Sequence, residues 1–174
     1  SRLAPLTHHE YNIFTVIIPS AIHLKGNTMQ FTKDELDALL AQPKPLQLKN
    51  SDLSKADLHG ADLSKADLSG ANLSGTFLDD AKLRYADLTK ANLEGANLTN
   101  ANFHGAILIE ADLTDAILGD ADLSGANLSS ATLIYANLTE ANLSGTNLTG
   151  VKYNSYTQWP TGFDPLSVGA IRID

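Results

Sequence analysis

The chain has 174 residues, the length of one ordinary domain, and 20 acidic against 12 basic residues give it a formal net charge of −8. This charge disfavours direct binding to nucleic acid or to an anionic membrane unless a local basic patch overrides it. The absence of cysteine excludes a disulfide framework and a thiolate metal site. No apolar run is long enough to span a membrane and no secretory signal peptide is evident, so we expect a cytoplasmic protein.

Residues 1–28 differ in composition from everything that follows, and the only methionine is Met29. We interpret 1–28 as a leader or as a segment foreign to the protein. This segment contains the adjacent pair His8 and His9, and we leave it out of the fold prediction.

A short helix is predicted next, within an N-terminal cap over 29–45. Thr32 followed by Glu35 matches a capping box, which begins a helix. One helical face is apolar and consists of Leu36, Leu39 and Leu40. Pro43 and Pro45 then end the segment. The pattern predicts a helix over 32–42 that covers the start of the following segment.

Residues 46–155 repeat every five residues without a break. A large residue, which we call position i, recurs from Leu48 to Tyr153 and gives 22 pentapeptides. Position i is leucine in 20 of them, the exceptions being Phe103 and Tyr153, and position i−2 is alanine in 17. The other positions are polar: Asp or Asn at i−1, Ser or Thr at i+1, and Gly, Lys, Asp or Asn at i+2.

A period of five fits neither an α-helix nor a straight strand. On a helix, successive leucines would lie about 140° apart and spread around the axis. On a straight strand, an odd period would send them to alternate faces. Each pentapeptide must therefore turn the chain, with positions i−2 and i inside and the other three outside.

This A-(D/N)-L-x-x run resembles the pentapeptide-repeat family, including its cyanobacterial members. The resemblance implies an all-β fold, a right-handed quadrilateral parallel β-helix with four pentapeptides in each coil. Five and a half coils at a strand spacing of about 4.8 Å would form a rod about 26 Å long. An N-terminal capping helix and a C-terminal cap would cover the two apolar ends.

The last segment, 156–174, is predicted to be that C-terminal aromatic cap. Aromatic residues cluster where the repeats end, namely Tyr153, Tyr156, Trp159 and Phe163. Pro160, Gly162 and Pro165 interrupt regular structure. The stretch from Trp159 to Pro165 is similar to tails that follow bacterial, especially cyanobacterial, pentapeptide repeats.

No constellation in the chain predicts catalysis, a cofactor or a metal, so we expect no enzyme. His59 and His104 both occupy position i+1 on different faces, and we interpret them as surface residues. Asp52 and the carboxylates at 57, 62 and 67 lie on four successive outward positions rather than in a cleft. Neither a P-loop nor a dinucleotide-binding glycine motif is present.

Several outward positions break the polar pattern of the repeat. They form either a partner site or a neutral surface, and the candidate partner surface comprises Phe77, Ile107, Ile109, Ile117 and Ile134 with Asp79, Asp80 and Asp120. If four pentapeptides make one coil, the face centred on Leu58 and every fourth leucine after it carries about −5. The next face, centred on Leu63, carries about +1.

Two functions from different classes remain open. The first is a non-catalytic structural or interaction solenoid with an unidentified protein partner, compatible with a homodimer formed through an end or a face. The second is a DNA-mimicking regulator that binds DNA gyrase or another DNA-binding protein, as the family resemblance suggests. A rod of this length would replace roughly 15 phosphates, whereas the acidic face has five carboxylates.

Overall fold

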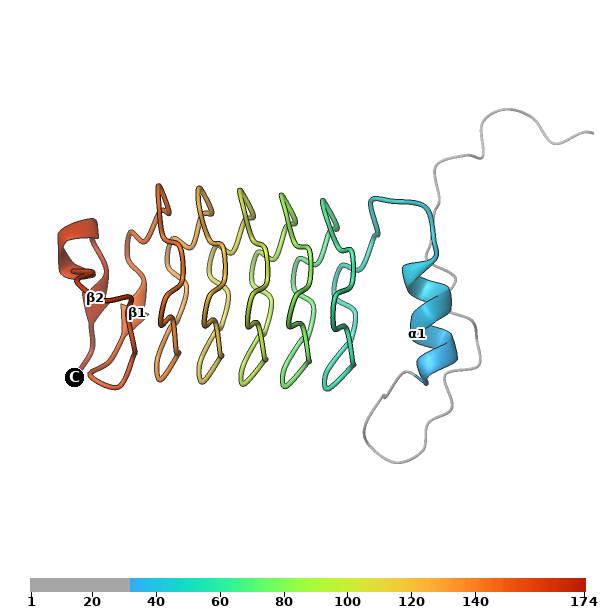
Figure 1. Cartoon of the computed structure of the whole chain (residues 1–174), viewed down its shortest axis with the longest axis horizontal. Coiled ribbons are helices and arrows are strands. Elements are labelled where there is room, and N and C mark those ends of the chain that lie inside the picture. Colours follow the sequence, from blue (N-terminus) through green and yellow to red (C-terminus); the bar gives the residue numbers. More distant parts are fainter. Residues whose placement is uncertain (1–31) are drawn as a thin grey trace, which may run out of the picture.

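The chain forms a rod of stacked coils with a helix across one end (Figure 1). This computed structural model describes residues 32–174, so the predicted leader at 1–28 and the start of the predicted cap lie outside the described residues. In chain order the named elements are helix α1 (Lys33–Leu40), strand β1 (Lys152–Tyr153), the 3-10 helix η1 (Leu166–Val168) and strand β2 (Ile171–Arg172). Among the residues described, no helix has the length and apolar character that a membrane crossing requires.

Helix α1 begins with the predicted capping box. The hydroxyl of Thr32 accepts a hydrogen bond from the backbone N–H of Glu35 at 3.3 Å, and the Glu35 carboxylate accepts one from the Thr32 N–H at 2.8 Å. The helix ends at Leu40, two residues before the predicted end. Leu36 is buried in the core of the rod, and Leu39 and Leu40 pack against that core, so the apolar face of α1 covers the first coil.

The coils are held together by parallel backbone pairing with a step of twenty residues. Every bridge from Gln47↔Asp67 to Thr132↔Lys152 joins two residues twenty positions apart. In one example, Leu98 N–H donates to the Ile117 carbonyl at 2.7 Å. Since each pentapeptide has five residues, four of them complete one coil, and the predicted quadrilateral β-helix is confirmed.

Each corner of the coil is a tight turn closed by one hydrogen bond. The carbonyl of position i accepts from the N–H of the next position i−2, as Leu98 does from Ala101 at 3.0 Å. Position i+2 has positive φ at every corner from Asn50 to Gly150, for example 59° at Lys90 and 63° at Gly95. This left-handed backbone is what the third residue of a type II turn requires, and it favours Gly, Asn and Asp.

The Asp or Asn at position i−1 has a structural role. In all fifteen pentapeptides that carry it, the side-chain oxygen accepts a hydrogen bond from the backbone N–H of position i+1. Asn97, for example, accepts from Thr99 N–H at 3.2 Å. This local bond gives a partner to the N–H of position i+1, which donates no hydrogen bond to the backbone of a neighbouring coil.

The interior is filled by positions i and i−2, as predicted. Leu98 and Phe103 are fully buried, and so are the alanines beside them, such as Ala96 and Ala101. The rod therefore has one continuous apolar core enclosed by four polar faces.

One extra residue shifts the repeat near the C-terminal end. The last isolated bridge joins Asn137 to Gln158, a step of 21 instead of twenty. Thr157 is buried at the resulting position i−2, where its hydroxyl donates to the Leu133 carbonyl at 2.8 Å. Trp159 then takes position i, so the solenoid continues four residues beyond the predicted boundary at 155.

Aromatic and strand contacts close this end of the rod. Trp159 meets Tyr153 edge to face and stacks on Phe163, with ring centroids 5.4 and 5.3 Å apart. Strand β2 pairs with β1 in parallel and starts a further coil (Figure 1). The Asp174 carboxylate accepts hydrogen bonds from Ser155 and Arg172, and these bonds lower its pKa.

Candidate functional site

One face of the rod is acidic along its whole length. We define the acidic face as the outward residues of the pentapeptides centred on Leu58, Leu78, Leu98, Leu118 and Leu138. The twenty-residue register brings its carboxylates onto one side of the rod, and these are Asp57, Asp79, Asp80, Asp120 and Glu140. None of these pentapeptides contains Lys or Arg. The one histidine of these pentapeptides, His59, is therefore their only side chain that can carry a positive charge.

Two large apolar side chains lie among these carboxylates. Phe77 and Ile117 are 53% and 47% exposed, and both are bridged to Asn97, so they lie in one column two coils apart. Both occupy position i−1, where neither can accept the hydrogen bond that Asp or Asn accepts in fifteen other pentapeptides. The coil therefore has no need of an apolar residue at these two positions.

The other predicted apolar residues lie elsewhere. Ile107 is exposed and bridges Asp87 and Asn127 on the face opposite the acidic face, since 107 and 117 are half a coil apart. Ile109 is half-buried on that same opposite face, and Ile134 is half-buried on a third face. The structure thus brings Phe77 and Ile117 together with Asp79, Asp80 and Asp120, and it separates the remaining three isoleucines from them.

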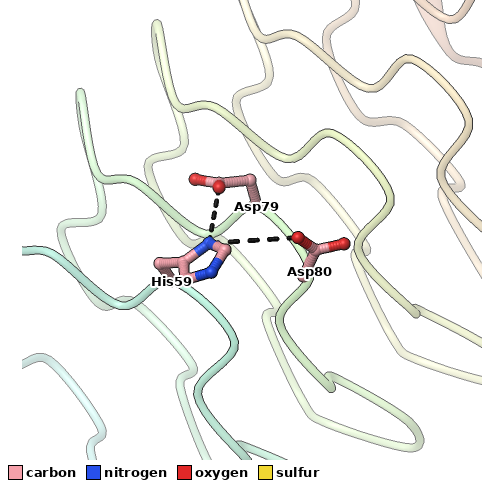
Figure 2. Close-up of side chains that lie close together, drawn as sticks. All are labelled: His59, Asp79 and Asp80. Atoms are coloured by element: carbon pink, nitrogen blue, oxygen red, sulfur yellow. Dashed lines mark hydrogen bonds and ion pairs between the residues drawn. The ribbon is translucent and has the colours of Figure 1, made fainter.

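A histidine and two aspartates converge on the acidic face (Figure 2). Nδ1 of His59 lies 2.6 Å from Oδ2 of Asp79 and 4.0 Å from Oδ2 of Asp80. Asp79 also accepts a hydrogen bond from the Asn97 side chain at 3.3 Å. His59 was predicted to be a surface residue without a role, and the twenty-residue spacing between 59 and 79 is the signal in the sequence that indicates this contact.

The contact between His59 and Asp79 is an exposed ion pair. The hydrogen bond to Asp79, followed by the charge of Asp79, raises the pKa of His59 above its ordinary 6.5. The three side chains offer one imidazole nitrogen and two carboxylate oxygens within 4.8 Å of one another, the donor types that a divalent cation accepts. The 2.6 Å between the nitrogen and the Asp79 oxygen is a hydrogen-bond distance, shorter than the roughly 3.3 Å that separates two ligands of a tetrahedral zinc ion, so the arrangement fits an ion pair better than a zinc site.

The pair predicts a specific pH dependence. Because the folded-state pKa of His59 is raised, the pair is complete below pH 6.5 and is lost as the pH rises through that raised value. We expect the Asp79→Asn change to return the pKa of His59 towards 6.5, measured by NMR titration of the imidazole. Asp80→Asn should act less, since Asp80 lies 4.0 Å away. A His59 titration that Asp79→Asn leaves unchanged would show that the pair does not form in solution.

Comparison with known proteins identifies the repeat directly. The family model for pentapeptide repeats (8 copies) matches residues 47–80, 78–115 and 111–150. A pentapeptide repeat protein of known structure from Nostoc PCC 7120 is 32% identical over 73% of this chain and 84% of its own, with a TM-score of 0.38. Another, from the thylakoid lumen of Arabidopsis thaliana, is 38% identical over 51% and 66%, with a TM-score of 0.43.

More distant matches include QnrB1, a plasmid-mediated fluoroquinolone resistance protein, at 18% identity over 74% of this chain and 82% of its own, with a TM-score of 0.40. The comparison with curated proteins gave no match. The family model covers more than half of the chain, and the Nostoc protein is matched over most of its length. The chain belongs to the pentapeptide-repeat family.

Proposed function

We propose that this protein is a non-catalytic binding scaffold whose acidic face docks a protein partner. The observation that carries the proposal is the pair Phe77 and Ile117, two exposed apolar side chains at positions where the coil itself favours Asp or Asn. Single exposed apolar residues are common on protein surfaces, but two in one column of a rigid, charged face are typical of a contact site.

The geometry of the face defines the partner that would fit it. Phe77 and Ile117 are two coils apart, which corresponds to about 10 Å at the usual strand spacing. Asp79 and Asp80 lie beside the first, and Asp120 lies beside the second. A complementary surface would have two apolar depressions with Lys or Arg around them, and the charges would mainly raise the association rate and the specificity.

DNA mimicry is the second candidate, supported by the absence of Lys and Arg on the acidic face. Duplex DNA as long as the rod would carry roughly 15 phosphates, whereas this face has five carboxylates and two apolar interruptions. The likeness to QnrB1 shows nothing about a shared activity. Inhibition of DNA gyrase supercoiling by the purified protein would support mimicry over an apolar docking site.

Substitutions on opposite faces test the docking proposal. We expect the double change Phe77→Asn and Ile117→Asn to fold normally, because Asn occupies position i−1 in neighbouring pentapeptides, and to reduce capture of the protein that the intact chain retains from a lysate. Ile107→Asn is the matched control, since it makes the same kind of change on the opposite face, and it should leave capture unchanged.

Neutralising the carboxylates completes this experiment. Changing Asp79, Asp80 and Asp120 to Asn should weaken capture less than the apolar changes do, and mainly at low salt, because exposed charges are screened. The opposite order, with the apolar changes silent and the acidic ones abolishing capture, would contradict an apolar docking site and favour mimicry.

A further inference from the structure

A basic patch lies on the face next to the acidic face. It consists of Lys65, Lys82 and Arg84, which come from two successive coils of that face. Within residues 32–174, none of the three forms an ion pair with a carboxylate, whereas Lys90 pairs with Glu110 at 3.5 Å. Asp62 and Asp122 of the same face interact with Lys82 and Arg84 through their charges, without an ion pair, so three cations against two carboxylates leave this face positive on a chain whose net charge is −8.

The guanidinium of Arg84 lies near an aromatic ring. Its central carbon lies 5.6 Å from the centroid of the Tyr85 ring, which meets His104 of the next coil edge to face at 5.5 Å. The ring lies against Gly105, where a Cβ atom would come within 2.6 Å of a Tyr85 ring carbon. Because the next coil supports the ring, a cation–π contact with it restricts the positions of the Arg84 donor groups.

The spacing of the cations fits an extended acidic peptide. Lys82 and Arg84 lie on either side of the buried Leu83, and Arg84 begins the following turn, so their side chains leave the same face with Cα atoms up to about 7 Å apart. Alternate side chains of an extended peptide have the same spacing, and the fork of Arg84 can bind a carboxylate through two hydrogen bonds.

The basic patch is short along the axis of the rod, because carboxylates lie on the same face on both sides of it. Asp62 and Asp122 lie on the same face, one coil before and two coils after the coil that contains Lys82 and Arg84. Asp62 belongs to the preceding coil, and Asp122 lies one coil beyond His104. A long polyanion such as nucleic acid would run onto these carboxylates, whereas a segment with two acidic groups would fit between them.

We propose that the basic patch is a second docking surface, which binds an extended acidic segment of a partner protein through carboxylates at alternate positions. Arg84 holds one carboxylate and Lys82 holds the next. The proposal goes beyond the docking function of the acidic face, since the two surfaces differ in charge and in residues. A rod with both would join a basic partner to an acidic one.

Fluorescence anisotropy with a labelled peptide in which Glu alternates with Ser tests the proposal at low salt. We expect the intact chain to bind, and the change of Lys82 and Arg84 to Gln to weaken binding at least about tenfold. Tyr85→Leu, which keeps every charge but removes the stacking, should weaken it about threefold. Lys90→Gln is the matched control, because Lys90 is already paired with Glu110, and it should leave binding unchanged.

Three results would overturn the proposal. The first is a peptide that does not bind the intact chain. The second is an equal loss of binding in the Lys90→Gln control, which would reveal only general charge attraction. The third is a single-stranded oligonucleotide that binds this patch more tightly than the peptide. Circular dichroism of each variant distinguishes the loss of a contact from the loss of the fold. None of these variants changes Phe77 or Ile117, so a failure of this proposal is distinguishable from a failure of the docking function of the acidic face.

Discussion

Replacing Leu98 by alanine is expected to destabilise the solenoid by about 2–5 kcal/mol, through lost burial and the cavity left behind. Leu98 is fully buried at the middle of the rod, with coils stacked on both sides that cannot close the gap without breaking their backbone pairing. Urea unfolding followed by circular dichroism measures the loss as a lower transition midpoint.

Glu94→Ala is the matched control for this change. Glu94 lies one pentapeptide earlier at position i+1, where its side chain is exposed to solvent. Its replacement should alter the free energy of unfolding by no more than about 0.5 kcal/mol. Equal losses at Leu98 and Glu94 would mean that the assignment of inward and outward positions is wrong.

Deleting residues 156–174 is the second change with a large expected effect. The deletion removes backbone partners of the last complete coil: the carbonyls of Gln158 and Gly169 and the N–H groups of Ile171 and Ile173. It also uncovers Tyr153, which now packs on Trp159. We expect the transition midpoint to fall and the truncated chains to associate through the bared end, since unpaired strand edges template association.

Light scattering of the truncated and intact chains at equal concentration measures this association. A particle mass that increases with concentration for the truncated chain alone is the expected result. A truncated chain that keeps the mass of the intact chain under the same conditions would show that 156–174 is not required as a cap.

The periodic part of this fold could be predicted from the sequence because its spacing is unusually restrictive. A five-residue period excludes a helix and a straight strand, and the alternation of Ala and Leu distinguishes inside from outside. The capping box of Thr32 and Glu35 is equally local, and it forms as predicted. By contrast, the residue inserted before Thr157 breaks the period, and the backbone bridge from Asn137 to Gln158 and the buried hydroxyl of Thr157 show that the coil continues.

The candidate site could be predicted less well, because it depends on contacts between coils. The pairing of His59 with Asp79 follows from the twenty-residue register, whereas the outward position of each residue in its own repeat does not indicate it. The predicted partner surface combined Phe77 with Ile107, which the same register places on opposite faces. The Tyr85 ring packs against Gly105 only in one side-chain rotamer, and the spacing of residues in the sequence does not specify that rotamer.

The most direct test of the docking function measures stability and capture on the same variant, Phe77→Asn with Ile117→Asn. The new Asn side chains can accept the backbone hydrogen bonds at Asp79 and Gly119, each contributing about 0.5–1.5 kcal/mol, which offsets the contacts that two half-exposed apolar side chains lose. We expect the free energy of unfolding to stay within about 1 kcal/mol of the intact chain while partner capture is lost. Destabilisation by more than about 2 kcal/mol, or unchanged capture, would contradict the claim that these two residues serve binding rather than the fold.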